Sequence, residues 1–94
     1  MTGLARTSAG LDERRRRLLF RSWRRGSREM DLIMGRFAEA ELEGLGDDGV
    51  AEFERLCEVA DADLYAWLTG ARDVPEDYDL PVFRRLRDGL GPRP

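Results

Sequence analysis

The stretch "RRGSREMD", residues 24–31, lies where one amphipathic pattern ends and another begins. Gly26 interrupts the helical spacing, and Ser27 suits the position just before the first turn of a new helix. Glu29 and Asp31 would then lie in that first turn, where the helix dipole favours acidic side chains. The stretch therefore predicts a turn between two helices, with charged residues gathered at the corner.

Apolar residues recur at helical spacing on both sides of this turn. The spacing before it predicts a helix over residues 11–24, and a second helix begins after Ser27. The apolar stripes of these two helices consist of Leu11, Leu18, Leu19 and Trp23 in the first, and Met30, Ile33, Met34, Phe37 and Leu45 in the second.

Three further helices are expected in the second half of the chain. "GLGDDG", residues 44–49, is a break after which Asp47 or Asp48 caps a third helix. "DADLYAWLTG", residues 61–70, predicts a fourth that ends at Gly70, and residues 71–79 are expected to form a loop. The last helix is expected to start near residue 79 or 80, to hold Pro81 in its first turn and to stop at Gly89.

No segment alternates with the period of a strand, so the predicted fold is all-α, a small single-domain bundle of about five short helices. Residues 1–10 lack apolar periodicity and are expected to form a flexible amino-terminal arm. Residues 11–90 form the helical domain, and residues 91–94 are expected to be a frayed carboxyl terminus.

The composition excludes most of the usual catalytic groups. All 16 basic residues are arginine, so the chain has no lysine for a Schiff base, and it has no histidine to act as a general base or metal ligand. Its single cysteine, Cys57, can form no disulfide within the chain, which favours a reducing compartment, and it is expected to be a small buried hydrophobe. We therefore expect no enzyme, no metal site and no stably bound cofactor.

Charge is distributed unevenly along the chain, although its net charge is only −3. Residues 1–36 hold ten arginines and four acids, whereas residues 37–94 hold six arginines and fifteen acids. The arginine-rich run at 14–25 is open to three interpretations: a solvated or internally paired helix face, a nucleic-acid contact, or a membrane-surface helix. We favour the first, because the domain is acidic overall and has no recognition-helix signature.

Individual residues also have a structural and a functional interpretation. Asp61 and Asp63 suit capping of the fourth helix better than metal binding, and Trp67 suits the core. Of Phe20 and Trp23, one is expected in the core and one on the surface. Around Gly26, the charges are either trim on a structural corner or part of a surface that a partner approaches closely.

Two motifs together resemble a known family. "RRGSREMD" contains the pattern RGxxE as Arg25, Gly26 and Glu29, and "DADLYAWLTG" follows some thirty residues later with the pattern D-x-x-L-[YF]-x-W-L. In order, spacing and chain length the sequence is similar to the SdhE family, also called succinate dehydrogenase assembly factor 2, over roughly residues 12–90.

The resemblance implies a small five-helix assembly factor that binds the flavoprotein subunit of succinate dehydrogenase and promotes covalent attachment of its FAD to a histidine of that subunit. Some family members are also associated with the fumarate reductase flavoprotein. The FAD would be carried by the partner. Carried over by position, the motif residues Arg25, Gly26 and Glu29, flanked by Arg28 and Asp31, would form the partner-binding site.

We expect a bacterial cytoplasmic protein rather than one of the mitochondrial matrix, an expectation that rests only on the short amino-terminal arm. We expect no membrane insertion. A second class of function stays open at this point: a regulator that binds nucleic acid, or neutralises a toxin, through the arginine-rich first helix.

Overall fold

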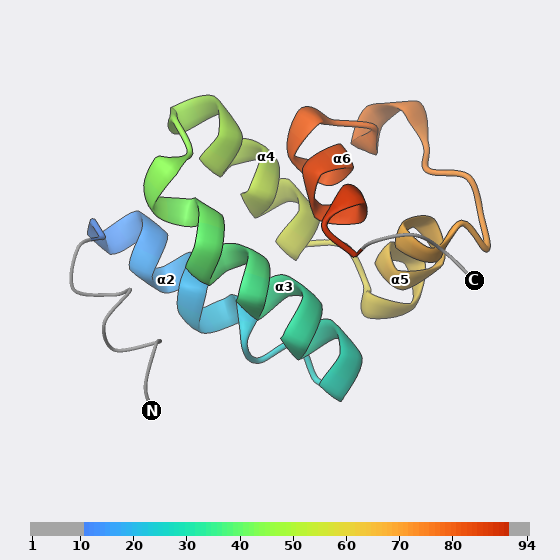
Figure 1. The fold of residues 1–94 in the computed structure, drawn as a ribbon, viewed down its shortest axis with the longest axis horizontal. Coiled ribbons are helices and arrows are strands. Elements are labelled where there is room, and N and C mark those ends of the chain that lie inside the picture. The colour runs from blue at the N-terminus through green and yellow to red at the C-terminus, as the bar shows by residue number, and fades with distance from the viewer. Residues whose placement is uncertain (1–10, 91–94) are drawn as a thin grey trace.

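Five α-helices account for most of residues 11–90, the part of the chain that the computed structural model describes (Figure 1). Two single turns of 3-10 helix lie between them, and no strand occurs among these residues. The prediction of an all-α fold with five short helices is confirmed. The helices are α2 (Glu13–Ser22), α3 (Arg28–Glu41), α4 (Asp47–Cys57), α5 (Asp61–Thr69) and α6 (Pro81–Asp88), and the 3-10 turns are η1 (Leu42–Gly44) and η2 (Glu76–Tyr78).

Several helix ends follow the local chemistry that the sequence predicted. The Ser27 hydroxyl accepts a hydrogen bond of 3.2 Å from the Met30 N–H and so caps α3. Gly70 ends α5 in the left-handed conformation, with φ of 82°. Pro81 is the first residue of α6, where its missing N–H has no cost.

Other predicted helix ends were wrong. Neither Asp47 nor Asp48 caps α4: Gly46 holds the cap position, and both aspartates lie in the first turn, where they still complement the helix dipole. Asp61 and Asp63 lie likewise inside the first turn of α5, after Ala60. The first helix is also shorter than the predicted range of 11–24, because the Asp12 carboxylate caps it by accepting the Arg15 N–H at 2.9 Å.

The core is built from one face of each helix. Helix α2 packs beside α3 and α4, and α4 packs beside α6, with α5 next to α6 (Figure 1). The two bulkiest fully buried side chains, Phe53 of α4 and Phe83 of α6, lie in this core. Cys57 is buried too, as predicted. The other buried hydrophobic residues are Leu11, Leu18, Leu19, Met30, Met34, Ala38, Leu42, Leu45, Val50, Leu56, Leu64, Leu68, Val82 and Leu86.

Two further predictions concern residues outside the five α-helices, and the structure differs from both. The loop expected at 71–79 contains η2, and Leu45, expected on the second helix, follows η1 as a buried residue. The predicted arm at 1–10 and the predicted frayed end at 91–94 lie outside the described residues. None of the helices described between 11 and 90 is long and apolar enough to cross a membrane.

Trp23, just after α2, packs directly against Gly35 of α3. Its indole lies over Gly35, and its Nε1–H donates to Glu39 Oε2 at 3.0 Å, whereas Phe20 is 55% exposed. One aromatic residue is therefore packed and the other is on the surface, as predicted. A Cβ atom at position 35 would lie 2.3 Å from the Trp23 ring, a distance at which the ring has to move.

We therefore expect Gly35→Ala to lower the free energy of unfolding by roughly 1–3 kcal/mol, because overpacking outweighs the better helix propensity of alanine. Gly44→Ala is the matched control, since a Cβ there meets nothing within 4 Å. Urea denaturation followed by circular dichroism would compare the two. Equal stabilities would show that Trp23 moves outward without cost.

Candidate functional site

The connection between α2 and α3, residues 23–27, forms a tight corner, referred to below as the α2–α3 corner. Gly26 lies at its apex with φ of 112°, a backbone conformation that residues with a side chain rarely adopt. A Cβ atom at Gly26 would meet nothing within 4 Å, so its backbone angle, and not lack of space, requires glycine there. The corner is exposed at the glycine, as the sequence predicted.

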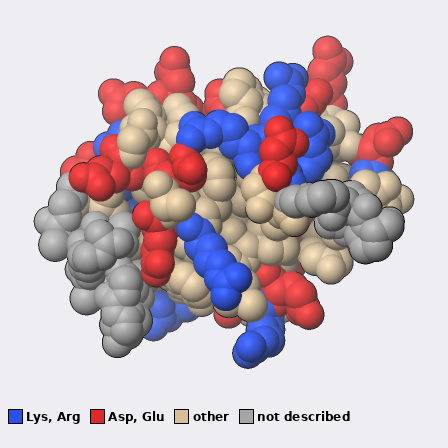
Figure 2. Space-filling view, in the orientation of Figure 1, with Lys and Arg blue, Asp and Glu red and all other residues tan. Residues whose placement is uncertain are grey.

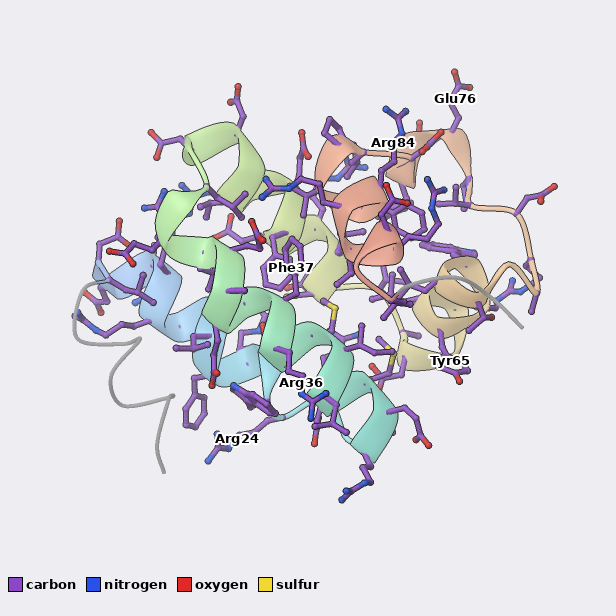
Figure 3. All side chains as sticks on the ribbon, in the orientation of Figure 1. Arg24, Arg36, Phe37, Tyr65, Glu76 and Arg84 are labelled. Atoms are coloured by element: carbon purple, nitrogen blue, oxygen red, sulfur yellow. The ribbon has the colours of Figure 1, made fainter. Side chains whose placement is uncertain are left out.

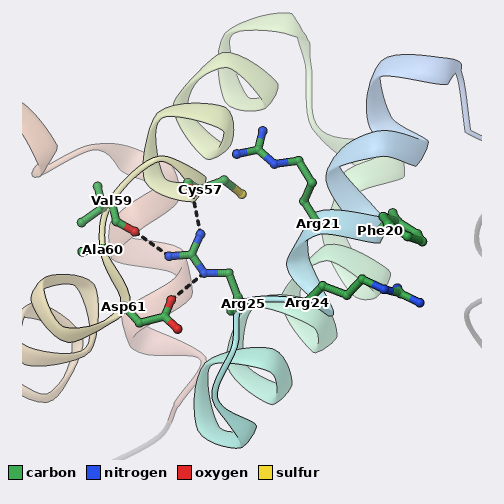
Figure 4. A pocket seen from close by; sticks show the side chains of 8 residues that line it. All are labelled: Phe20, Arg21, Arg24, Arg25, Cys57, Val59, Ala60 and Asp61. Atoms are coloured by element: carbon green, nitrogen blue, oxygen red, sulfur yellow. Dashed lines mark hydrogen bonds and ion pairs between the residues drawn. The ribbon is translucent and has the colours of Figure 1, made fainter.

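Arg25 turns inward from this corner, and its side chain is only 8% exposed. Its guanidinium donates from Nε to Asp61 Oδ1 at 2.8 Å, from Nη1 to the Cys57 carbonyl at 2.5 Å and from Nη2 to the Val59 carbonyl at 2.6 Å (Figure 4). These four groups, called here the Arg25 clamp, tie the α2–α3 corner to the connection between α4 and α5.

Asp31 holds the same corner from α3. Its Oδ1 accepts the backbone N–H of Arg25 at 2.5 Å and that of Gly26 at 3.3 Å. A carboxylate that accepts two backbone N–H groups fixes the course of the chain, because those donors would otherwise be unpaired at the turn. Asp31 therefore shapes the corner, and its bonded oxygen points toward the backbone.

The other predicted site residues point outward. Gly26, Arg28 and Glu29 are exposed, and Glu29 lies in the first turn of α3. The structure thus brings all five predicted residues to one corner but divides them. Arg25 and Asp31 are engaged inside the fold, whereas Gly26, Arg28 and Glu29 are available to a partner.

A shallow hollow of about 360 Å³ lies beside Glu29, between the start of α3 and α5. Tyr65 on its rim is 42% exposed, one of the two large exposed hydrophobic residues in the described part of the chain. The hollow, called the Glu29 hollow below, is lined by Ser27, Glu29, Met30, Asp61, Ala62 and Tyr65.

Asp61 and Tyr65 were not predicted as site residues. Asp61 was interpreted as a helix cap, but its carboxylate instead pairs with Arg25 across 36 residues of sequence. Both lie in "DADLYAWLTG", the second motif on which the family resemblance rests. That motif was the only sequence signal that singled them out.

Part of the uneven charge along the sequence is balanced by ion pairs between the two halves of the chain. Arginines from the first half pair with acids on or just after α4: Arg14 with Glu54 at 2.7 Å, Arg21 with Glu58 at 2.8 Å and Arg25 with Asp61. The two hydrogen bonds from Arg14 hold the pKa of the Glu54 carboxyl below its ordinary value. In Figure 2, basic and acidic side chains accordingly interleave over the visible face instead of forming separate blocks.

This pairing bears on the three interpretations of the arginine-rich run. Charge held by a neighbouring carboxylate is not available to a phosphate backbone or to an anionic lipid surface. Within the described residues, the run is therefore best interpreted as an internally paired face. The nucleic-acid alternative is not favoured.

Cys57 lies at the end of α4, beneath the clamp. Burial raises the pKa of its thiol above the ordinary value, so little reactive thiolate forms near neutral pH. Its carbonyl, meanwhile, accepts a hydrogen bond from Arg25. No group of histidine, cysteine and acidic residues in the described part of the chain could hold a metal ion.

Comparison with known proteins agrees with the resemblance drawn from the two motifs. Residues 16–89 match the family Sdh5, described as the flavinator of succinate dehydrogenase, and this match spans both the α2–α3 corner and α5. The chain belongs to this family.

Curated relatives of the Sdh5 family carry related names. The FAD assembly factor SdhE of Acetobacter pasteurianus is 37% identical over 76 residues, which cover 81% of this chain and 70% of that protein. Succinate dehydrogenase assembly factor 2-B, mitochondrial, of Drosophila ananassae is 34% identical over 85 residues, covering 88% of this chain and 52% of that protein. The chain thus spans about half the length of such mitochondrial relatives. No solved structure matches it.

The clamp should be a main source of stability. Removing one partner of a buried, hydrogen-bonded charge leaves the other groups unpaired, so Arg25→Ala should lower the free energy of unfolding by on the order of 3 kcal/mol. Arg28→Ala, three residues away and exposed, should change it by less than about 0.5 kcal/mol. Urea denaturation of both variants tests this, and a loss as small for Arg25→Ala as for Arg28→Ala would contradict the clamp.

The thiol of Cys57 reports on the same region. In the native protein it should react with an aromatic disulfide reagent on the order of 100-fold more slowly than in urea, because burial and a raised pKa both suppress the thiolate. The reaction rate should rise with pH only above the range in which an ordinary thiol ionises, because the pKa of Cys57 is raised. Arg25→Ala should speed it under native conditions and Arg28→Ala should not; equal rates in folded and unfolded protein would show that Cys57 is accessible.

Proposed function

We propose that this chain is an assembly factor that binds the flavoprotein subunit of succinate dehydrogenase and promotes the covalent attachment of FAD to a histidine of that subunit. The observation that carries the proposal is the family match over residues 16–89, together with an exposed corner at the RGxxE motif. The curated relatives named as assembly factors support it. The fumarate reductase flavoprotein is proposed as a second partner of the same chemistry.

The chain has no histidine, so the acceptor in this reaction belongs to the partner. Covalent flavinylation joins a histidine nitrogen to the 8α-methyl carbon of the flavin. The methyl C–H and the histidine N–H each lose a proton, and the electron pair of the C–H bond reduces the flavin ring, so the flavin itself is the oxidant. We assign the flavin to the partner as well, and the bacterial cytoplasm as the place of assembly. What remains for this chain is to bind the flavoprotein and to hold the reacting groups in alignment.

Within this proposal, the exposed residues of the corner contact the partner, and the buried residues fix the conformation of the corner. Gly26 lets the partner's backbone approach closely, while Arg28 and Glu29 offer a positive and a negative group beside it. Arg25 and Asp31 keep the corner in one conformation before the partner arrives. A pre-organised surface loses less conformational entropy on binding, so more of the interaction free energy remains to orient the partner.

Glu29→Ala should therefore separate function from fold. We expect covalent flavin in the partner to fall by about tenfold or more, because an alignment effect is lost, while stability changes by no more than about 1 kcal/mol. The measurement is in-gel flavin fluorescence of the denatured flavoprotein subunit, with circular dichroism of the variant in parallel. Glu43→Ala, another exposed acid, is the control.

The outcomes separate the levels of the proposal. If the wild-type chain fails to raise covalent flavin, the proposed function is wrong. If the wild-type chain acts and Glu29→Ala acts equally well, the function stands, and the assignment of the site to this corner is wrong. Unfolding of Glu29→Ala would show that its role is structural.

A further inference from the structure

A second feature of the surface lies across the corner from the Glu29 hollow. Phe20 of α2 is 55% exposed, more than any other large hydrophobic residue described, although Leu18 and Leu19 beside it are buried. A single exposed apolar residue is ordinary. This one, however, lies on the rim of a hollow of about 440 Å³ that also contains three arginines (Figure 4).

Arg24, just beyond α2, completes the rim. Its guanidinium carbon lies 3.8 Å from the centre of the Phe20 ring, a cation–π contact that orients both groups. Among the described residues Arg24 forms no ion pair, in contrast to Arg21 and Arg25. Figure 3 shows its side chain projecting away from the ribbon. Within residues 11–90 its hydrogen-bond donors have no partner, so they can bind a carboxylate from outside.

We call this hollow the Phe20 hollow. Besides Arg24, it is lined by two more arginines, Arg21 and Arg25. Arg21 donates to Glu58 through Nη2 at 2.8 Å and keeps other N–H groups without a partner among the described residues. The Arg25 guanidinium forms the hydrogen bonds of the clamp. Among the described residues, Arg21 and Arg25 pair with Glu58 and Asp61, so the excess positive charge at this hollow is the one that Arg24 carries.

The Phe20 hollow and the Glu29 hollow share Asp61, which lines both. A partner that covers the α2–α3 corner would therefore reach the two hollows together. We propose that the Phe20 hollow is a second part of the docking surface, and that it receives an acidic segment of the flavoprotein, with one carboxylate on Arg24 and an apolar neighbour on Phe20. This inference rests on the proposed function and names the kind of partner surface involved.

A phosphate-bearing ligand fits less well than a carboxylate. Phosphates favour helix amino-termini, where several backbone N–H groups and the positive end of the dipole converge. This hollow lies beside the carboxyl-terminal ends of α2 and α4. It also reaches the amino terminus of α5, but there the Asp61 carboxylate lies in the first turn and opposes a phosphate group. An exposed aromatic ring paired with an arginine suits a protein segment, since both residue types are common among the side chains that dominate protein interfaces.

The test measures binding of the full chain to the purified flavoprotein subunit carrying non-covalent FAD, at low and at high salt. Arg24→Gln should weaken binding by about fivefold and Arg24→Glu by about tenfold or more, and both should flatten the salt dependence. Phe20→Ala should weaken binding by about fivefold with the salt dependence unchanged. Arg84→Glu is the control, an exposed arginine at the opposite edge of the molecule in Figure 3.

Each outcome has one meaning, provided circular dichroism shows that the variants are folded. If the wild-type chain binds and the Phe20 and Arg24 variants bind equally well, the inference is wrong, whereas the proposed function stands. If the wild-type chain does not bind, the proposed function fails first. If free FAD binds the chain alone, by quenching of flavin fluorescence, and only this binding is lost in Arg24→Glu, the hollow is a nucleotide site and the inference is overturned.

Discussion

The fold depends on one guanidinium placed where three segments meet. A helix leaves its last carbonyl groups without partners inside the helix, and these carbonyls need donors from elsewhere. Arg25 donates to the carbonyl of Cys57, the last residue of α4, and to that of Val59 just beyond it, and its Nε–H donates to the Asp61 carboxylate. Arginine suits this position better than lysine because its planar fork fixes several donors in one plane. The direction in which α5 leaves α4, and the shape of both hollows, follow from this contact.

The same chemistry recurs at the other end of α2. Arg15 donates from Nε to the Leu42 carbonyl at 3.0 Å and from Nη2 to the Leu45 carbonyl at 2.5 Å, just beyond the end of α3. Exposed ion pairs contribute little to stability one by one, but an arginine that satisfies carbonyls at a helix end removes a real cost. A chain with arginine as its only basic side chain can therefore use part of that charge as internal scaffold. Arg15 and Arg16 of α2 serve in this way, by donating to backbone carbonyls.

Part of the local chemistry could be predicted from the sequence, whereas the long-range partners of individual side chains could not. Ser27, Gly70 and Pro81 act within a few residues of their own positions, and each holds its predicted place. The inward turn of Arg25 depends on acceptors more than thirty residues away, so no spacing near Gly26 reveals it. Asp61 illustrates the same limit: a cap was predicted from its neighbours, whereas its partner is decided by packing.

The RGxxE motif thus contains residues with two different structural roles, one buried and one exposed, which the sequence alone does not distinguish. Its arginine faces the interior and its glutamate faces solvent, and Asp61 connects them, since its carboxylate bonds Arg25 while the residue lines both hollows. A ligand that binds only the folded form stabilises whatever conformation it contacts. A partner seated across this corner would therefore favour the closed clamp, and the clamp in turn would hold Glu29 where the partner meets it. If the proposed partner contacts Glu29 here, stability and recognition are coupled at this corner, because both depend on the Asp61 carboxylate.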